Sequence, residues 1–167
     1  MIRPATPDDA DLVCQLILEL AEYEEAAPGA AVTTPEAVRA ALDPAAEPRL
    51  SGLVAETEAG EPAGFALFFP IYSTWRANWG LYLEDLFVRP AFRGQGFGFA
   101  LLQAVAAEAV RRGAHRLDWV VLDWNRLAID FYERLGAVPL SDWTVMRLQG
   151  EALTRLASAD LGVRDAE

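Results

Sequence analysis

Along the chain, apolar positions follow helical spacing in some segments and strand spacing in others. In residues 10–21, apolar side chains recur every three or four positions, which is the period of one buried helix face. Thr6, followed by a proline and two aspartates, gives this helix a capping hydroxyl and acidic groups at its positive end. Because Cys14 falls on the apolar face, it is expected to be a core residue rather than a nucleophile.

The same spacing rules predict strands and helices in alternation over most of the chain. Strands are expected at 1–3, 50–57, 62–69, 79–88, 116–122 and 143–148, and helices at 6–25, 34–42, 99–112, 126–135 and from 151. Residues 70–78 are expected to form an aromatic loop. Strands interleaved with helices indicate an α/β fold with a mixed sheet. We expect a single domain over residues 1–159 and a frayed tail at 160–167.

Residues 82–102 combine a strand, a basic turn with three glycines and the start of a helix. Pro90 ends the strand, because proline cannot donate to a sheet ladder. Gly94, Gly96 and Gly98 then lead into the helix. A glycine-rich turn at a helix N-terminus gathers unpaired N–H groups and the positive end of the helix dipole, which favours an anion such as pyrophosphate. A plain strand-to-helix turn is the alternative interpretation of the glycines alone.

The spacing does not fit two common nucleotide motifs. A P-loop requires Lys and then Ser or Thr after its last glycine, whereas Phe99 and Ala100 stand here. The dinucleotide fingerprint requires G-x-G-x-x-G, whereas these glycines occupy every second position. The pattern present is Arg-x-x-Gly-x-Gly, formed by Arg93, Gly96 and Gly98.

Charge is distributed unevenly along the 167 residues, whose net charge is −11. Residues 1–66 carry three Arg and thirteen Asp or Glu, a net charge of −10, whereas residues 86–136 carry seven Arg and five acids, a net charge of +2. This asymmetry indicates an acidic part suited to a cation and a more basic part suited to an anion. A merely soluble acidic surface is the alternative.

Composition restricts the function further. One Cys and one His leave no internal disulfide and argue against a metal site, so no metal is expected. A pI near 4.5 argues against a nucleic-acid partner. The first residues lack a signal-peptide pattern and no apolar run is long enough to span a bilayer, so we expect a cytoplasmic protein that does not bind membranes.

Four stretches resemble the GNAT superfamily of N-acetyltransferases, in particular its spermidine/spermine, diamine and thialysine N-acetyltransferases. They are residues 2–6, 19–24, 82–98 and 124–137. The resemblance implies a mixed, mostly antiparallel sheet with helices on both faces and a splayed strand pair at the acetyl-CoA site. It also implies a homodimer that transfers acetyl from acetyl-CoA to a primary amine of a diamine, a polyamine or a thialysine-like amino acid. Ser73 stands where the polyamine enzymes tend to carry an aspartate, which argues against long polycations.

The resemblance implies a set of cofactor-binding positions. N–H groups of residues 93–98, with the charge of Arg93, would hold the pyrophosphate, and the N–H of Phe87 is a candidate donor to the oxyanion. Asn125 would bond the pantetheine arm, cap the following helix, or do both. The whole set is Leu86, Phe87, Val88, Arg93, Gly94, Gln95, Gly96, Phe97, Gly98, Phe99 and Asn125.

Acetyl transfer also requires a base, because an alkylammonium with a pKa near ~10.4 has no lone pair. Glu84 is the candidate base, acting through water, and Asp85 is its helper or a structural partner, because neighbours on a strand point to opposite faces unless the strand bulges. Both acids simply pairing with arginines is the alternative. Tyr132 is the candidate general acid for the CoA thiolate, although it also suits a helix core. The substrate-binding set is Tyr23, Glu24, Trp75, Glu84, Asp85 and Trp143.

Two other functions stay open at this point. One is acetylation of peptide, protein or antibiotic amines by an enzyme of the same fold, and the other is a non-catalytic acyl-CoA-binding sensor. The aromatic segment around Trp75 argues against the open groove that the first would need. The presence of both Glu84 and Tyr132 argues against the second.

Overall fold

The computed structural model describes residues 1–47 and 49–158 of the chain. Its internal contacts divide the chain into two compact units, residues 1–120 and 121–167. The expectation of a frayed tail at 160–167 falls outside the described residues.

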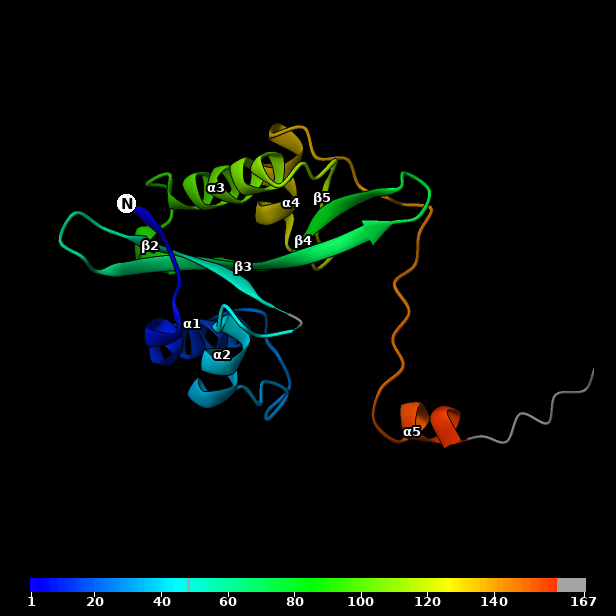
Figure 1. Cartoon of the computed structure of the whole chain (residues 1–167). Helices are drawn as coiled ribbons and strands as arrows, with labels where there is room; N and C mark the ends of the chain where they lie inside the picture. The colour runs from blue at the N-terminus through cyan, green and yellow to red at the C-terminus, as the bar shows by residue number, and fades with distance from the viewer. Residues whose placement is uncertain (48, 159–167) are drawn as a thin grey trace, which may run out of the picture. The chain divides into compact units, whose positions relative to one another are not determined.

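The first unit contains a five-stranded mixed sheet in the order β1-β2-β3-β4-β5. The first four strands pair antiparallel and β5 pairs parallel with β4, as the α/β prediction requires. The strands are β1 (Ile2–Pro4), β2 (Ser51–Glu56), β3 (Pro62–Ser73), β4 (Asn78–Val88) and β5 (Leu117–Asp118). In Figure 1, α1 (Ala10–Tyr23) and α2 (Pro35–Leu42) lie on one face of the sheet and α3 (Phe97–Arg111) lies on the other.

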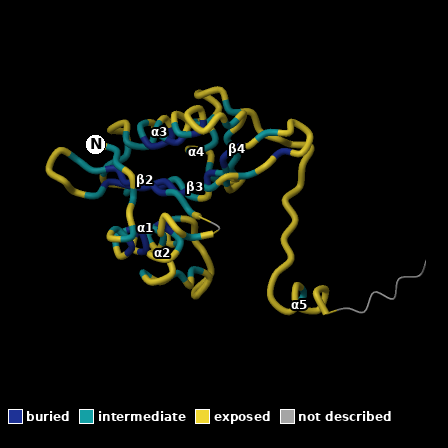
Figure 2. The backbone as a smooth tube through the Cα atoms, viewed as in Figure 1, coloured by how far each residue is buried: buried dark blue, intermediate teal, exposed yellow. Residues whose placement is uncertain are grey.

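The main core lies between the sheet and the first two helices. It contains side chains of α1, α2 and the three strands β2–β4, among them Val13, Leu16, Phe65, Leu67 and Phe87. Cys14 belongs to this core, as its position on the apolar stripe predicts. The buried segments of Figure 2 follow the central strands and the helix faces that cover them.

The start of α1 follows the sequence signal closely. Thr6 and Asp9 form a capping box around a 3-10 turn, Pro7–Asp9, in which the Thr6 N–H donates to Asp9 Oδ2 at 2.8 Å. Asp9 also accepts two hydrogen bonds from the Arg3 guanidinium, which hold the pKa of this carboxyl down at about 2. α2 begins in the same manner, with Thr34 Oγ1 accepting from the N–H of Ala37.

The prediction of an aromatic loop at residues 70–78 is largely wrong. β3 continues to Ser73 and β4 begins at Asn78, so only a tight turn separates two long antiparallel strands. Pro70 is tolerated opposite Leu81, and the rings of Tyr72 and Trp79 contact at a centroid distance of 5.1 Å across the hairpin. Such cross-strand aromatic pairs stabilise the pairing of β3 with β4 at this end of the hairpin.

Two other strand predictions fail. The strand expected at 116–122 is reduced to Leu117–Asp118. Residues 143–148 form no strand, because an extended segment becomes one only by bonding to a neighbouring strand. In the described structure this segment is largely exposed, with 74% of Val145 and 86% of Met146 accessible. The described part of the second unit instead contains two helices, α4 (Arg126–Arg134) and α5 (Gly150–Ser158).

Candidate active site

The glycine turn has the geometry of an anion cradle. After the 3-10 turn Pro90–Phe92, Gly94 and Gly96 adopt φ values of +76° and +87°. Residues other than glycine rarely adopt such positive φ values. α3 then begins at Phe97 with Gly96 as its N-cap, so its first N–H groups have no partner within the helix. A Cβ added at Gly94 or Gly96 would meet no atom within 4 Å, which leaves room for a phosphate to approach the backbone.

Arg93 lies at the start of this turn but is directed toward α1. Its Nε donates to the carbonyl of Val88 at 3.0 Å, and its guanidinium carbon lies 4.2 Å from the centroid of the Tyr23 ring. The same guanidinium is 5.9 Å from the Phe87 centroid. These contacts are made within the protein and join the glycine turn to the last turn of α1.

The acidic pair in β4 is brought onto one face of the sheet by a β-bulge. Asp85 lies opposite Leu67, and Leu83 lies opposite the next β3 residue, Phe68, so Glu84 is an extra residue in β4. Phe68 faces α3, since the guanidinium carbon of Arg112 is 5.7 Å from its ring. Because paired residues share a face, Leu83 also faces α3, and the side chains on either side of the bulge fall on the opposite face.

Both carboxylates therefore lie on the α1 face. Leu67, the partner of Asp85, belongs to the core beneath α1 and α2. Glu84 follows Leu83, which faces α3, so alternation turns its side chain to the α1 face, where its charge acts on Asp85. Neighbouring residues of a strand can share a site only if the strand bulges, and the register provides that bulge.

The surroundings of Asp85 oppose its ionisation. Burial is the largest cause, followed by the negative charges of Glu84 and Glu24, and together they raise the pKa of Asp85 to about 6. Partial burial also raises the pKa of Glu24, which caps the end of α1. Among the described residues, no ion pair involves Glu24, Glu84 or Asp85, so the alternative that the acidic pair merely neutralises arginines is not supported.

The open edge of β4 lies beyond its short pairing with β5. That pairing joins Leu81 to Leu117 and Tyr82 to Asp118, and the described part of β5 has no partner for the rest of β4. The N–H of Arg89 donates to Ala63 on β3, and alternation directs the N–H of Phe87 to β3 as well. The choice of Phe87 as oxyanion donor is therefore wrong, because the N–H groups of Leu86 and Val88 are those directed to the open edge.

Several predicted substrate residues occupy different surroundings. Tyr23 and Glu24 end α1 on the same face as the acidic pair, and Tyr23 also contacts the Phe87 ring at a centroid distance of 6.3 Å. Trp75 lies in the β3–β4 turn with 88% of its surface accessible, so the first unit alone does not enclose it. Ser73 is buried, and its Oγ accepts from the N–H of Arg76 within that turn.

The second unit contains the remaining predicted residues. Asn125 is the N-cap of α4, with its Oδ1 accepting from the N–H of Ala128 at 3.2 Å. This observation confirms the capping role and leaves the cofactor role as a prediction. Tyr132 is half-buried in α4 beside Phe131, with a ring centroid distance of 5.3 Å, and Trp143 has 69% of its surface accessible.

Sequence reasoning missed one ion pair beside the site. Glu19 in α1 accepts from Arg89 at both guanidinium Nε and Nη2, each at 2.7 Å, and Arg89 Nη1 donates to the carbonyl of Pro62. The pair is mostly shielded from solvent and joins α1 to the end of β4. No spacing rule relates these two positions, which are far apart in the sequence, so only the fold could reveal the contact.

A family model for the GNAT acetyltransferases matches residues 17–137 of the chain. The chain belongs to the GNAT family. The match includes the second half of α1, the bulged strand, the glycine turn and α4, and it continues across the boundary between the two units. The protein is therefore an acetyl-CoA-dependent N-acetyltransferase, as the resemblance in its sequence implied.

Similar GNAT relatives act on small amines according to their names. A thialysine N-epsilon-acetyltransferase of Bos taurus is 40% identical over 94% of this chain and 96% of its own length. An L-ornithine N5-acetyltransferase of Arabidopsis thaliana is 50% identical over 54% of this chain, and the match covers 40% of the plant protein. An integron cassette protein from the mobile metagenome of V. cholerae superposes with a TM-score of 0.77 over 95% of this chain and 98% of its own, at 24% identity, and thus shares the fold.

The geometry of the glycine turn fits the pyrophosphate of acetyl-CoA. The space beside Gly94 and Gly96, the positive end of α3 and the two positive φ values together leave the backbone N–H groups accessible to an anion. In the described part of the chain, no cluster of His, Cys, Asp and Glu could hold a metal ion. None of its helices combines the length and apolar character that a membrane crossing requires.

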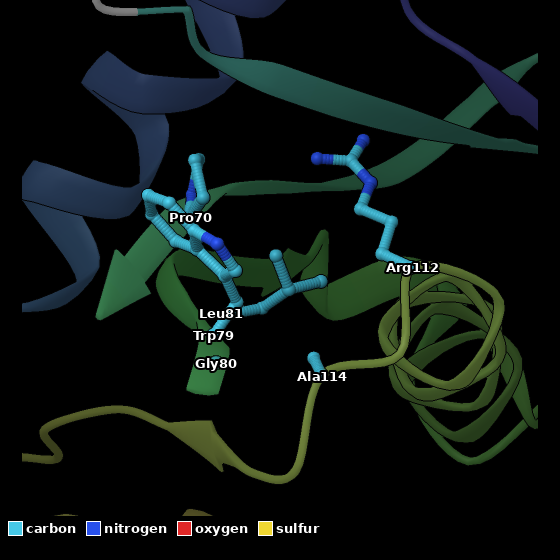
Figure 3. A pocket seen from close by; sticks show the side chains of 6 residues that line it. All are labelled: Pro70, Trp79, Gly80, Leu81, Arg112 and Ala114. Atoms are coloured by element: carbon cyan, nitrogen blue, oxygen red, sulfur yellow. The ribbon is translucent and has the colours of Figure 1, made fainter. Parts of the chain in front are cut away.

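A hollow of about 230 Å³ lies on the α3 face of the first unit, away from the acidic pair. Figure 3 shows its walls, formed by the start of β4 with Pro70 of β3 on one side and by the residues that follow α3 on the other. Its lining residues are Pro70, Trp79, Gly80, Leu81, Arg112 and Ala114. Since the acidic pair faces α1 and the glycine turn precedes α3, this hollow contains neither of the groups that the chemistry needs.

Proposed function

We propose that this GNAT enzyme acetylates the terminal primary amine of a small basic amino acid or diamine, such as ornithine or a thialysine-like compound. The observation that carries the proposal is the bulge that gathers Glu84 and Asp85 on the face where Glu24 ends α1. Three carboxylates with no arginine paired to them form a site for a compact cation. The names of the thialysine and ornithine acetyltransferases, which are 40% and 50% identical over the matched lengths, support this substrate class.

The site also suits deprotonation of the bound amine. A free alkylammonium with a pKa near ~10.4 must lose its proton before it can attack, which costs about 4–5 kcal/mol at pH 7 without a base. We assign Glu84 as the base, acting through a water molecule, with Asp85 beside it as the group that shares the proton. A pKa of about 6 lets Asp85 hold or release a proton near neutral pH, which suits that role.

Acetyl transfer then forms one C–N bond and breaks one C–S bond. The neutral amine attacks the thioester carbonyl, and the negative oxygen of the tetrahedral intermediate would accept from the N–H groups of Leu86 or Val88 at the open edge of β4. When the C–S bond breaks, the attacking nitrogen loses its second proton to water, and Tyr132 would donate its phenolic proton to the departing thiolate and then regain one from water. The net products are the acetylated amine, CoA in its thiol form and one proton.

The remaining assignments complete the proposal. The turn residues from Arg93 to Phe99 would hold the pyrophosphate, and Asn125 would reach the pantetheine arm while it caps α4. Trp75 and Trp143 would line the amine site, where an aromatic face attracts a cation. Trp75, which is 88% exposed, would be enclosed in the homodimer that we infer from the resemblance.

The first experiment measures CoA thiol release with acetyl-CoA and a panel of amines. We expect L-ornithine, thialysine and short diamines to be acetylated faster than spermine or a lysine-containing peptide. Lack of acetylation of every amine, despite tight CoA binding, would support a non-catalytic sensor instead. Faster acetylation of the peptide than of all small amines would refute the proposed substrate class.

A second experiment tests the general acid. Replacing Tyr132 with Phe should lower kcat about 10²-fold or more, because general acid catalysis contributes about 10²–10⁴-fold, while the Kd for CoA changes little. Glu133→Gln, which changes an exposed side chain of the same helix, is the matched control. An unchanged kcat in Tyr132→Phe would remove Tyr132 from this role.

A further inference from the structure

The last turn of α1 touches both halves of the proposed site. The ring of Tyr23 lies under the guanidinium of Arg93, with 4.2 Å between the ring centroid and the guanidinium carbon. Arg93 is the first residue of the glycine turn, which is the cofactor turn of the proposed site. The next residue, Glu24, is close enough to Asp85 for its charge to contribute to the raised pKa of that carboxyl. Tyr23, the last residue of α1, thus contacts the first residue of the glycine turn, and its neighbour Glu24, the C-cap of α1, acts through its charge on the acidic pair.

Arg93 is held firmly in this bridging position. Its Nε donates to the Val88 carbonyl, and its backbone N–H donates to the carbonyl of Pro90, so both ends of the residue are fixed. The guanidinium carbon lies over the ring of Tyr23 on α1 and over that of Phe87 on β4, and these two rings also contact each other. A movement of α1 relative to β4 would therefore move the first residue of the turn.

A second contact fixes the same helix one turn earlier. Glu19 precedes Tyr23 by four residues, so the two side chains lie on the same side of α1. Glu19 binds Arg89 in a bidentate pair with both distances at 2.7 Å, and Arg89 directly precedes the 3-10 turn that leads to Arg93. The segment from Arg89 to Arg93 is thus attached to α1 at both ends.

The end of α1 is itself well defined. The N–H of Glu24 donates to Leu20 at 2.9 Å, and the N–H of Ala26 reaches back to Ala21 at 3.0 Å. Glu25 adopts a φ of +55°, which ends the helix immediately after Glu24. Tyr23 and Glu24 therefore cannot change position independently of each other.

From these contacts we propose that Tyr23 is a positioning residue for the cofactor turn, acting through Arg93, and that it thereby couples acetyl-CoA binding to amine binding at Glu24 and Asp85. This inference rests on the proposed function and replaces the expectation from the sequence that Tyr23 contacts the amine. A ligand that fixes the turn would fix the end of α1, and the amine would then bind to carboxylates already in place. Because such coupling is reciprocal, a bound amine should tighten CoA by the same factor.

The test measures binding by calorimetry, with CoA and L-ornithine as the probes. Tyr23→Leu removes the aromatic face and should weaken CoA on the order of 10-fold, although Tyr23 lies outside the glycine turn. Tyr23→Phe keeps the face and should bind CoA within about 2-fold of the wild type. In the wild type, saturating CoA should lower the Kd for L-ornithine, and Tyr23→Leu should abolish this effect.

A double-mutant cycle with Arg93→Gln isolates the contact. If Tyr23 acts through Arg93, the double variant should bind CoA no more weakly than Arg93→Gln alone. Additive losses would overturn the inference, and so would Tyr23→Phe binding CoA as weakly as Tyr23→Leu. Cooperative urea unfolding of each variant checks that it is folded.

The outcomes separate this inference from the proposed function. Wild-type protein that binds no CoA would overturn the proposed function, and this inference with it. Wild-type protein that binds CoA, together with a Tyr23→Leu variant that binds CoA equally well, would overturn this inference alone. A Tyr23→Leu variant that loses only its affinity for L-ornithine would return Tyr23 to the role of an amine contact.

Discussion

Replacing Asp85 with Asn should make the protein more stable while it damages the active site. In the folded protein the pKa of Asp85 is about 6, against an ordinary value of 3.8, because burial and the charges of Glu84 and Glu24 oppose its ionisation. The folded state therefore binds more protons than the unfolded state between these two values. Stability contributed by the protonated form is complete below pH 4 and is lost as pH rises through 6.

The size of the effect follows from the shift. A change of ~2 pKa units at 1.36 kcal/mol per unit corresponds to about 3 kcal/mol lost by neutral pH. Asn cannot ionise, so the variant escapes this loss. With the same two pKa values, the gain of Asp85→Asn over the wild type should grow by about 2 kcal/mol between pH 4.5 and pH 7.5.

Urea unfolding followed by circular dichroism at a series of pH values measures this difference directly. The quantity to compare is the difference in unfolding free energy between variant and wild type, followed as a function of pH. A difference that does not change with pH reports only how the amide packs. Asp8→Asn, at an exposed position before α1, is the matched control and should show no such growth. A gap for Asp85→Asn that stayed constant from pH 4.5 to 7.5 would refute the assignment of a buried, hard-to-ionise carboxyl.

Two further predictions concern backbone geometry near the site. Gly64→Ala should lower the free energy of unfolding by about 1–3 kcal/mol, because its Cβ would lie 2.3 Å from the Phe87 carbonyl oxygen and a backbone atom must move. Chemical denaturation checks this, with Gly98→Ala, whose Cβ would lie 3.8 Å from its neighbour, as a control of similar or greater stability than the wild type; equal losses in both would contradict the steric argument. Glu25→Gly should raise the free energy of unfolding by about 0.5–1 kcal/mol, since relief of a left-handed conformation exceeds the entropy that glycine adds to the unfolded chain. A clear loss of stability in this variant would show that the Glu25 side chain contributes more than its backbone costs.

Local signals in the sequence predicted the first unit well. Thr6 and Thr34 mark the beginnings of helical segments, and Gly94 and Gly96 mark the turn before α3, because capping and positive φ are properties of a few neighbouring residues. The hairpin was misjudged for the opposite reason. Tyr72 reads as a loop residue until it is paired with Trp79 across the two strands, and that pairing depends on residues outside its own segment.

The parts of the candidate site that could not be predicted are those that depend on register. Glu84 and Asp85 were recognised by their motif, but only the pairing of Leu67 and Phe68 with β4 reveals that one extra residue turns both acids to the same face. The direction of Arg93 is a similar case, since its motif suggested phosphate and its contacts are with Tyr23 and Val88. A motif specifies which chemical groups are present, whereas tertiary contacts determine where they point.

The bulge and the glycine turn together suggest why β4 is organised as it is. A regular strand would place Glu84 and Asp85 on opposite faces, so one charge would enter the α3 side and the amine site would lose a carboxylate. The extra residue avoids this and leaves Phe87 in the core beneath α1, directly before Val88, whose carbonyl holds Arg93. Burying a carboxyl in this way costs stability, and such a cost persists only where the surrounding packing enforces it. The stability gain expected for Asp85→Asn measures the free-energy cost of burying this carboxyl. A loss of acetylation activity in the same variant would show that the buried carboxyl serves catalysis.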